Sequence, residues 1–481
     1  MLPFARITPT ADLRLWAVAG FLIFAFLIGG GARPDVQSLV LLRPISVLAC
    51  AAALFTLRWD DVRRHATLYA CAAATFAWVA IQLIPLPPAL WHLLPGRTVI
   101  ADIDTVAGLS SQWRPISLVP WATWNALYSL FTPLAVLLLG SQLKGRQSNP
   151  LLPVIIGFGA VSGLLGLLQI LGPVSSPLYF YSVTNEGAAV GLFANRNHAA
   201  ILLSSLFPML AVYASMNVRT PEQKRFRAGV GIAVVIVLIP LLLVTGSRIG
   251  VLTGVIGLAS AFLLYRPPAI TQAARRKGGS ETAKRAAIGA FAVASLAILV
   301  VLFSRAQAIE RLLAPDQIED LRFRVWGPIA ELGWKYFPFG SGMGSFVEVF
   351  RLDEPSAVLK PSYLNHAHND WLETLLTGGL PALLILAAAI VAYARRAITV
   401  WGRDERASQS SALARMASVI LLLLALGSAS DYPLRTPALM CIAIIAALWL
   451  GEARKPGDSN RSKIDGSSRR SSLARDMNLE E

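Results

Sequence analysis

Cysteine and charge are both scarce in this chain of 481 residues. Its three cysteines, Cys50, Cys71 and Cys441, all lie within apolar segments, which excludes a disulfide framework and a cysteine-based zinc site. Charged residues make up 15% of the chain and hydrophobic residues 55%, a balance that excludes a soluble globular protein. The composition therefore indicates an integral membrane protein.

The usual catalytic signatures are also missing. The sequence has no Gly-rich phosphate loop, no Gly-x-Ser-x-Gly, no His-Glu-x-x-His and no cysteine nucleophile. The polar groups that remain outside the apolar runs are mainly Arg, His and Asn. Such groups suit an anionic substrate, and we expect neither a metal nor a cofactor.

Apolar runs of about 20 residues recur along the chain, and each can cross a bilayer as a helix. We predict an all-α polytopic membrane protein with about 12 transmembrane helices. Their approximate bounds are 13–31, 36–57, 66–86, 121–143, 151–172, 195–215, 228–245, 247–265, 286–304, 368–394, 411–429 and 433–450. Arg6 and Arg14 before the first run resemble a signal peptide, but no small-residue cleavage site follows, so a retained helix is expected.

The net charge of +15 is explained by membrane topology. With a cytoplasmic N-terminus, Lys and Arg gather in every second gap between the spans. They are Arg58, Arg63, Arg64, Lys144, Arg146, Arg219, Lys224, Arg225, Arg227, Arg266, Arg275, Arg276, Lys277, Lys284, Arg285, Arg395, Arg396, Arg403 and Arg406. The positive-inside rule then puts both termini in the cytoplasm. Membrane lipids are expected partners, and no nucleic acid is needed.

These spans divide the chain into four parts. We predict transmembrane helices 1–9 in residues 1–304, a periplasmic loop in 305–367, helices 10–12 in 368–453 and a disordered cytoplasmic tail in 454–481. The loop includes an expected helix, Gln317–Tyr336, and a glycine turn, Phe337–Gly344. Aromatic residues and helical periodicity favour an ordered loop, and loops of this length commonly carry function.

The stretch Tyr363–Pro381 joins that loop to the next apolar run. It holds two of the five histidines, His366 and His368, followed by Asn369. Leu follows at 372, 375 and 376, so His368 is predicted to share a helical face with apolar residues. A polar group at a lipid boundary is a candidate functional site, although these histidines could instead only cap a helix and meet lipid headgroups.

Other polar groups lie at the predicted outer ends of spans. Arg248 follows Ser247 in a short break between two apolar runs, where it binds an anion or snorkels to lipid phosphate. Arg322 and Arg324 lie in the loop helix, and either suits phosphate recognition or a solvated helix face.

Two more polar segments lie at the predicted outer ends of spans. Asn195, Arg196 and Asn197 start the sixth span, where an asparagine could simply cap the helix. Arg435 lies in a short outer loop and is expected to pair with Asp431.

Taken in order, these segments resemble the O-antigen ligase and polymerase superfamily over roughly residues 150–450. The family's ligase pattern is His-[Asn/Ser/Gln]-x9-Gly-x-x-Gly, and here His368-Asn369 is followed by Gly379. Ala382 holds the last glycine position, which leaves both ligase and polymerase open. Further family blocks resemble Gly191–Asn197, Ser247-Arg248 and Arg324–Gly344.

The resemblance implies a GT-C-like glycosyltransferase of the bacterial inner membrane whose site faces the periplasm. Its donor would be a glycan on undecaprenyl diphosphate, its acceptor a lipid or glycan, and its partners other polysaccharide-assembly proteins. By the same resemblance Arg248 and Arg324 hold the diphosphate and His368 activates the acceptor, with inversion at the anomeric carbon. Supporting roles fall to Asn195, Arg196, Asn197, His366, Asn369 and Arg435. The alternative is a non-enzymatic transporter of polysaccharide or lipid-linked glycan.

Overall fold

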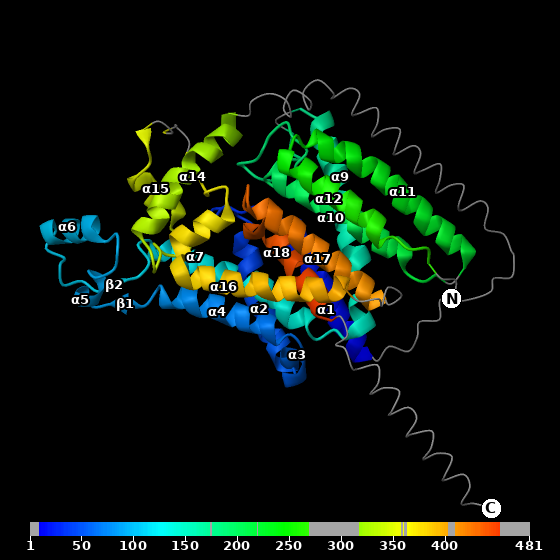
Figure 1. Cartoon of the computed structure of the whole chain (residues 1–481), viewed down its shortest axis with the longest axis horizontal. Coiled ribbons are helices and arrows are strands. Elements are labelled where there is room, and N and C mark those ends of the chain that lie inside the picture. Colours follow the sequence, from blue (N-terminus) through cyan, green and yellow to red (C-terminus); the bar gives the residue numbers. More distant parts are fainter. Residues whose placement is uncertain are drawn as a thin grey trace, which may run out of the picture.

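The computed structural model describes residues 9–173, 176–218, 220–268, 317–356, 359, 363–402 and 409–452. This part of the chain is almost entirely helical (Figure 1). Its one sheet is a short antiparallel ribbon, in which Pro85 of β1 (Pro85–Leu86) pairs with Pro115 of β2 (Arg114–Pro115). The predicted span 286–304 and the predicted tail 454–481 lie outside the described residues.

Among the described residues, seven helices or helix pairs are long and apolar enough to cross a membrane. They are α2 (Leu39–Thr56), α7 with α8 (Pro120–Ser129 and Phe131–Gly140), α9 (Leu151–Leu171), α10 (Arg196–Ser215), α11 (Pro221–Val244), α16 (Asp370–Trp401) and α17 (Gln409–Ser428). Four further apolar helical segments are shorter, namely Leu13–Ile28 of α1 (Pro9–Ile28), α4 (Ala66–Ile81), α12 (Arg248–Leu264) and α18 (Pro437–Gly451). The protein is a polytopic membrane protein, and eleven predicted spans each coincide with one of these elements.

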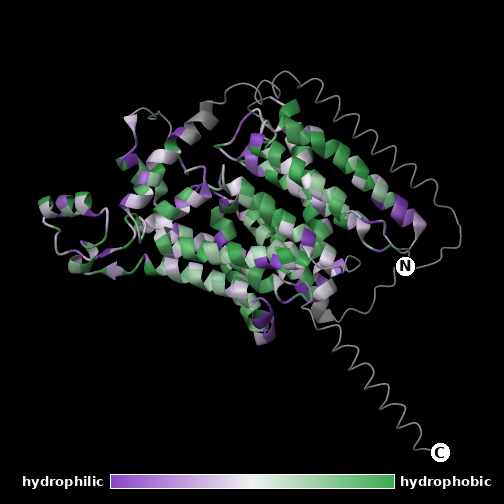
Figure 2. Cartoon of the chain, viewed as in Figure 1, coloured by the Kyte–Doolittle hydropathy of each residue, from purple (hydrophilic) through white to green (hydrophobic). Residues whose placement is uncertain are grey.

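The hydropathy of the surface agrees with this assignment. Figure 2 shows the bundle helices hydrophobic over most of their length, with hydrophilic residues mainly at their ends and in loops. Large apolar side chains such as Leu48 (67% exposed) and Phe55 (91% exposed) project outward from α2. Contiguous exposed apolar surface of this kind indicates contact with lipid.

The interior of the bundle is organised around α10, which is buried on nearly all sides. It packs closely against α12, because glycines of α12 leave room for the α10 backbone. A Cβ at Gly250 would lie 2.4 Å from Ala200 Cβ, and one at Gly257 would lie 2.5 Å from the Ser204 carbonyl oxygen. This close crossing brings the first turns of the two helices together.

A second apolar cluster lies beside the bundle, around the predicted loop helix. That helix is present as α14 (Gln317–Lys335), and α15 (Phe346–Leu352) follows it. Their buried residues, including Val325, Ile329 and Phe350, pack with Ala367 of the histidine stretch. The loop helix therefore covers the segment that carries the histidines.

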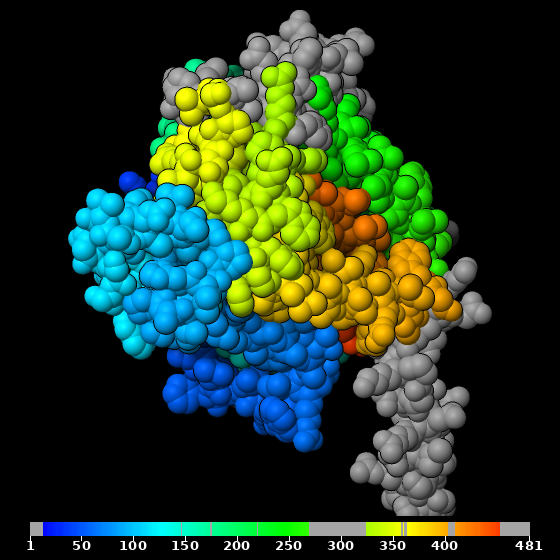
Figure 3. Space-filling model, turned by 60° about the vertical axis from the view of Figure 1, so that its left-hand side comes forward, coloured from blue at the N-terminus to red at the C-terminus, as the bar shows by residue number. Residues whose placement is uncertain are grey.

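A lobe of shorter elements lies beside α14 (Figure 3). It comprises α5 (Pro88–Trp91), α6 (Thr98–Val106) and the β1–β2 ribbon. Arg97, 1% exposed, joins the lobe to the glycine turn by donating to the Gly340 carbonyl at 3.0 Å. Three short helical segments remain, namely α3 (Trp59–Arg64), η1 (Gly145–Ser148) and η3 (Pro433–Arg435).

Helix α16 is kinked at Gly379, whose φ is 61° and ψ −158°. The glycine turn of residues 337–344 packs into this kink, where a Cβ on Gly379 would lie 2.2 Å from the Pro338 carbonyl oxygen. The turn donates backbone hydrogen bonds from Ser341 and Gly342 to carbonyls of α16, at 2.9 and 3.0 Å. The glycine of the ligase-like pattern thus serves a close backbone approach that no other residue type allows.

Candidate active site

Helices α10 and α12 begin beside each other, and each is capped by the residue before it. Asn195 accepts from the Asn197 N–H at 2.8 Å, and Ser247 accepts from the Gly250 N–H at 2.9 Å. The two caps are linked, because Ser247 Oγ donates to Asn197 Oδ1 at 2.7 Å. The capping alternative is therefore confirmed for Asn195, whereas Asn197 bonds beyond its own helix.

The fully buried carboxylate of Asp431 joins these caps to the histidine stretch. Its Oδ2 accepts from Asn195 Nδ2 at 3.0 Å and from Asn197 Nδ2 at 2.6 Å. Its Oδ1 accepts from the Tyr432 N–H at 3.1 Å and lies 3.1 Å from His368 Nδ1. A continuous chain of hydrogen bonds thus connects three segments that are far apart in the sequence.

This contact defines the chemistry of the His368 ring. A carboxylate accepts hydrogen bonds, so His368 Nδ1 carries the proton that faces Asp431. The other ring nitrogen, Nε2, is then the one that can take up a proton. Asp431 would also stabilise the imidazolium that results, since the pair is buried together.

His368 lies outside the helix that the sequence predicts for it. Helix α16 begins at Asp370, because the Asn369 side chain caps it by accepting from the N–H groups of Trp371 and Leu372 at 3.0 and 3.2 Å. The expected sharing of a helical face with leucines is therefore wrong.

The backbone of His368 is instead strained. Its φ is 48°, and it is the one residue other than glycine with positive φ among those the structure describes. Such a conformation costs on the order of 1–3 kcal/mol and persists only where the surroundings impose it. Here the Asp431 contact and the cap at Asn369 hold the residue on either side.

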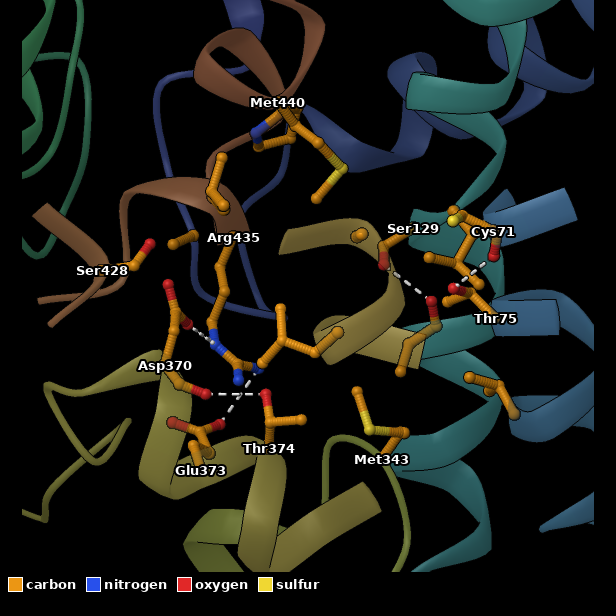
Figure 4. Close-up of a pocket in the computed structure, with 18 of the residues that line it drawn as sticks. Cys71, Thr75, Ser129, Met343, Asp370, Glu373, Thr374, Ser428, Arg435 and Met440 are labelled. Atoms are coloured by element: carbon orange, nitrogen blue, oxygen red, sulfur yellow. Dashed lines mark hydrogen bonds and ion pairs between the residues drawn. The ribbon is translucent and has the colours of Figure 1, made fainter. Parts of the chain in front are cut away.

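A second buried polar cluster surrounds Arg435 (Figure 4). Its Nε donates to Asp370 Oδ1 at 2.8 Å, and its Nη1 lies 3.0 Å from Glu373 Oε1. The predicted pairing of Arg435 with Asp431 is wrong, because the Asp431 carboxylate is directed to the asparagines and His368. Burial alone would lower the pKa of Arg435, but Glu373 and Asp370 raise it above its ordinary value.

His366 belongs to this second cluster. Its Nδ1 lies 3.1 Å from Glu373 Oε1, and the Ala367 N–H donates to Glu373 Oε2 at 2.9 Å. Each histidine of the stretch therefore has its own buried carboxylate. The two imidazoles serve different clusters, as expected for residues two positions apart.

The ring of Tyr432 separates the two clusters. Its centroid lies 4.4 Å from that of His366, 5.0 Å from that of His368 and 5.0 Å from that of His198. Three of the five histidines of the chain thus surround one phenol ring. This packing fixes the imidazole planes and keeps the clusters apart.

A comparison with protein-family models shows what part of this chain is similar to. Residues 232–387 match the O-antigen ligase family model. The resemblance seen in the sequence is confirmed for these residues, which are similar to the O-antigen ligase family, and the chain is a polytopic membrane protein. A search of curated proteins finds no match.

The matched O-antigen ligase region contains only part of the hydrogen-bonded chain. Ser247 and His368 lie within it, whereas Asn195, Asn197 and Asp431 lie outside. The residues that connect the site are thus supplied by α10 and by the loop before α18.

The arginines expected to hold a diphosphate are exposed. Arg248 is the first residue of α12 and directly follows Ser247, so its backbone position is fixed by the hydrogen-bonded chain. Arg324 lies on α14 beside Val325, which packs in the apolar cluster that includes Ala367. Arg196 is the half-buried first residue of α10, and the side chain of Arg322 lies outside the described residues.

A cavity of about 840 Å³ opens beside the Arg435 cluster. His366, Asp370, Glu373 and Arg435 line one end of it. Figure 4 shows the side chains of Asp370, Glu373 and Arg435 gathered there. Apolar residues of α4, α16, α17 and α18 line its middle. A cavity of this size accommodates a substantial part of a lipid or sugar ligand.

Sequence reasoning missed the roles of Asp431, Asp370 and Glu373. Glu373 could have been suspected, because an acid inside an apolar helix needs a buried cation or donor. The link from Asp431 to Asn197 joins residues 234 positions apart. Nothing in the local sequence of either residue indicates that link.

Proposed function

We propose that this protein is a metal-independent glycosyltransferase that moves a glycan from undecaprenyl diphosphate to an acceptor hydroxyl. The similarity of residues 232–387 to the O-antigen ligase family supports glycan transfer as the class of activity. The single observation that supports a catalytic histidine is the buried chain from Ser247 through Asn197 and Asp431 to His368. A carboxylate held in this way fixes the orientation of the imidazole that it contacts, which suits a group that must accept a proton in a defined geometry.

In the proposed reaction, His368 Nε2 accepts the proton of the acceptor hydroxyl. The hydroxyl oxygen attacks the anomeric carbon, and the bond from that carbon to the diphosphate oxygen breaks. The electron pair leaves with the diphosphate, and the configuration at the anomeric carbon inverts. Asp431 stabilises the imidazolium through Nδ1.

The departing diphosphate gains negative charge, which needs a cationic partner in a site of low dielectric constant. Arg248 and Arg324 are assigned this role, because guanidinium groups form paired hydrogen bonds with phosphate oxygens and stay charged. Arg196 lies at the start of α10, close in sequence to the connecting asparagines, and is assigned to substrate binding.

The remaining residues support the site. Asn195 and Asn197 orient Asp431, and Asn369 ends the helix that follows His368. His366 and Arg435 shape the adjoining end of the cavity. We assign the acceptor to that end, because it adjoins Tyr432, which also contacts His368.

The proposed setting is the bacterial inner membrane, with about 12 spans in a GT-C-like arrangement. Both termini are assigned to the cytoplasm and the site to the periplasm, in keeping with the placement of Lys and Arg. A polysaccharide transporter would need a polar pathway, whereas the middle of this cavity is apolar. Apolar walls suit a lipid chain better than the hydroxyls of a glycan.

Transfer by the purified full-length protein tests this proposal. The protein is incubated with a glycan on undecaprenyl diphosphate and with either a lipid-sugar acceptor or a second donor molecule. A glycosylated lipid identifies a ligase, and a lengthened glycan identifies a polymerase. Glycan movement across vesicles without any new glycosidic bond would refute transfer and support the transporter.

A further inference from the structure

The cavity beside the Arg435 cluster has a second charged end. Arg63, Arg64, His65 and Arg396 line it there. Along α16, Arg396 follows Glu373 by 23 positions, which corresponds to roughly 35 Å of helix. The cavity therefore extends over about the thickness of a bilayer hydrocarbon core, with a charged cluster at each end.

His65 is the most buried of the polar side chains that line this far end. It is 4% exposed, and neither Nδ1 nor Nε2 has a hydrogen-bond partner among the described residues. The ring lies against the end of α18, where a Cβ on Gly451 would lie 3.2 Å from Nδ1. Burial, with Arg64 and Arg396 nearby, lowers the pKa of His65 to about 4. An imidazole that is neutral, buried and unpartnered at a cavity wall calls for a polar ligand.

Three arginines surround that imidazole. Arg396 donates to the carbonyls of Leu450 and Gly451, at 3.1 and 2.5 Å, which holds its guanidinium at the end of α18. Arg64 is bound to Asp61 at 3.1 Å, and the Arg63 guanidinium lies over the Trp59 ring. These contacts hold the three guanidinium groups at this end of the cavity.

The described acids of this region include Asp61 and Glu452. Asp61 is buried between Arg64 and Lys144, whose Nζ lies 3.8 Å away. Burial raises the pKa of Glu452 to about 7, so this carboxyl is largely neutral in mildly acidic conditions. Neither acid lines the cavity.

The start of α4 adds to the positive potential. Helix α4 begins at Ala66, and Ala66 and Thr67 also line this end of the cavity. The first N–H groups of a helix and its macrodipole favour an anion. Arginines, a buried imidazole donor and a helix N-terminus thus converge on one small region.

We propose that the far end of the cavity binds the phosphate of a membrane lipid whose hydrocarbon chains occupy the apolar middle. Charge complementarity selects the phosphate. The continuous apolar wall, which includes Leu68, Ile390 and Ala447, selects a lipid rather than a soluble phosphate ester. This site lies at the opposite end of α16 from the histidine stretch and does not depend on glycosyl transfer.

Native mass spectrometry of the full-length protein in a phosphate-free maltoside detergent tests the site. The probes are phosphatidic acid, diacylglycerol with the same chains, and inorganic phosphate. We expect phosphatidic acid to bind, diacylglycerol to bind about tenfold or more weakly, and phosphate alone to compete only at much higher concentration. Equal binding of diacylglycerol would refute the phosphate site, and equally tight inorganic phosphate would refute a lipid ligand.

Two variants locate the binding. Thr67→Glu puts a carboxylate at the cavity end while favouring the first turn of α4, so the fold is retained. Arg63→Gln with Arg396→Gln removes two of the cations. Both variants should weaken phosphatidic acid binding about tenfold or more. Lys224→Gln with Arg225→Gln removes two cations of α11 that do not line the cavity and should change nothing. Unchanged binding in Thr67→Glu would overturn the proposal.

Discussion

His368 Nδ1 lies 3.1 Å from Asp431 Oδ1, and the other oxygen of the same carboxylate accepts from Asn195 and Asn197. The carboxylate thus orients the imidazole while the asparagines orient the carboxylate. Two segments outside the matched O-antigen ligase region supply these groups. The predictions below follow from that relationship and from the packing around it.

Asp431→Asn should reduce transfer by about 10²–10³, because an amide holds the imidazole with the wrong tautomer and cannot stabilise its cation. The donor concentration at half-maximal rate should stay within about threefold. Steady-state transfer assays give both quantities. If the maximal transfer rate is unchanged and only the donor concentration at half-maximal rate rises, Asp431 acts in binding and not through His368.

The Arg435 cluster should behave as one unit. Removing Arg435 leaves the buried Glu373 and the partly buried Asp370 without their cation, so Arg435→Gln should lower the apparent unfolding temperature strongly. Glu373→Gln added to that variant should recover part of the loss, because one uncompensated charge disappears. A double-mutant cycle on apparent unfolding temperature measures the coupling, and strictly additive effects would contradict it.

Gly379→Ala should destabilise the protein by on the order of 2 kcal/mol or more. The positive φ is unfavourable for alanine, and its Cβ would collide with the Pro338 carbonyl. Gly157→Ala, in α9 with no atom within 4 Å of the added Cβ, is the matched control. Thermal unfolding in detergent compares them, and equal unfolding temperatures would show that the kink does not need glycine.

Much of the architecture was accessible from the sequence, because each apolar run of bilayer length must form a helix whose backbone groups bond internally. The helix Gln317–Lys335 followed from periodicity in the same way. Local patterns also indicated His368 and Ser247-Arg248 as site residues. They could not show that Asp431 turns toward Asn197, because that contact depends on how α10 packs against α17 and η3.

In the histidine stretch, the first residue of α16 could not be predicted from the apolar periodicity either. Leucine spacing favours a helix that includes His368, but Asn369 caps the helix one residue later. Side-chain capping competes with apolar periodicity at a helix end. The leucine spacing therefore predicts a helix that begins before Asp370, where α16 starts.

Glu452 should make stability depend on pH. Burial raises its pKa from the ordinary 4.5 to about 7, so the unfolded chain releases this proton first. The cost of burying Glu452 therefore grows as pH rises from 4.5 to 7 and then stays constant. Glu452→Gln removes that cost, so its advantage in apparent unfolding temperature should be absent near pH 4 and largest above pH 7. An advantage that shrinks as pH rises would contradict the assignment.

The most direct test of the account compares transfer by His368→Asn and His366→Gln with that of the unaltered protein. Asparagine tolerates the positive φ at position 368 and can still donate to Asp431, but it cannot take up a proton. The account predicts that His368→Asn binds the lipid-diphosphate donor normally and transfers about 10²–10⁴ times more slowly, while His366→Gln stays within about tenfold. Unaltered transfer by His368→Asn, or a complete loss confined to His366→Gln, would contradict the claim that His368 activates the acceptor.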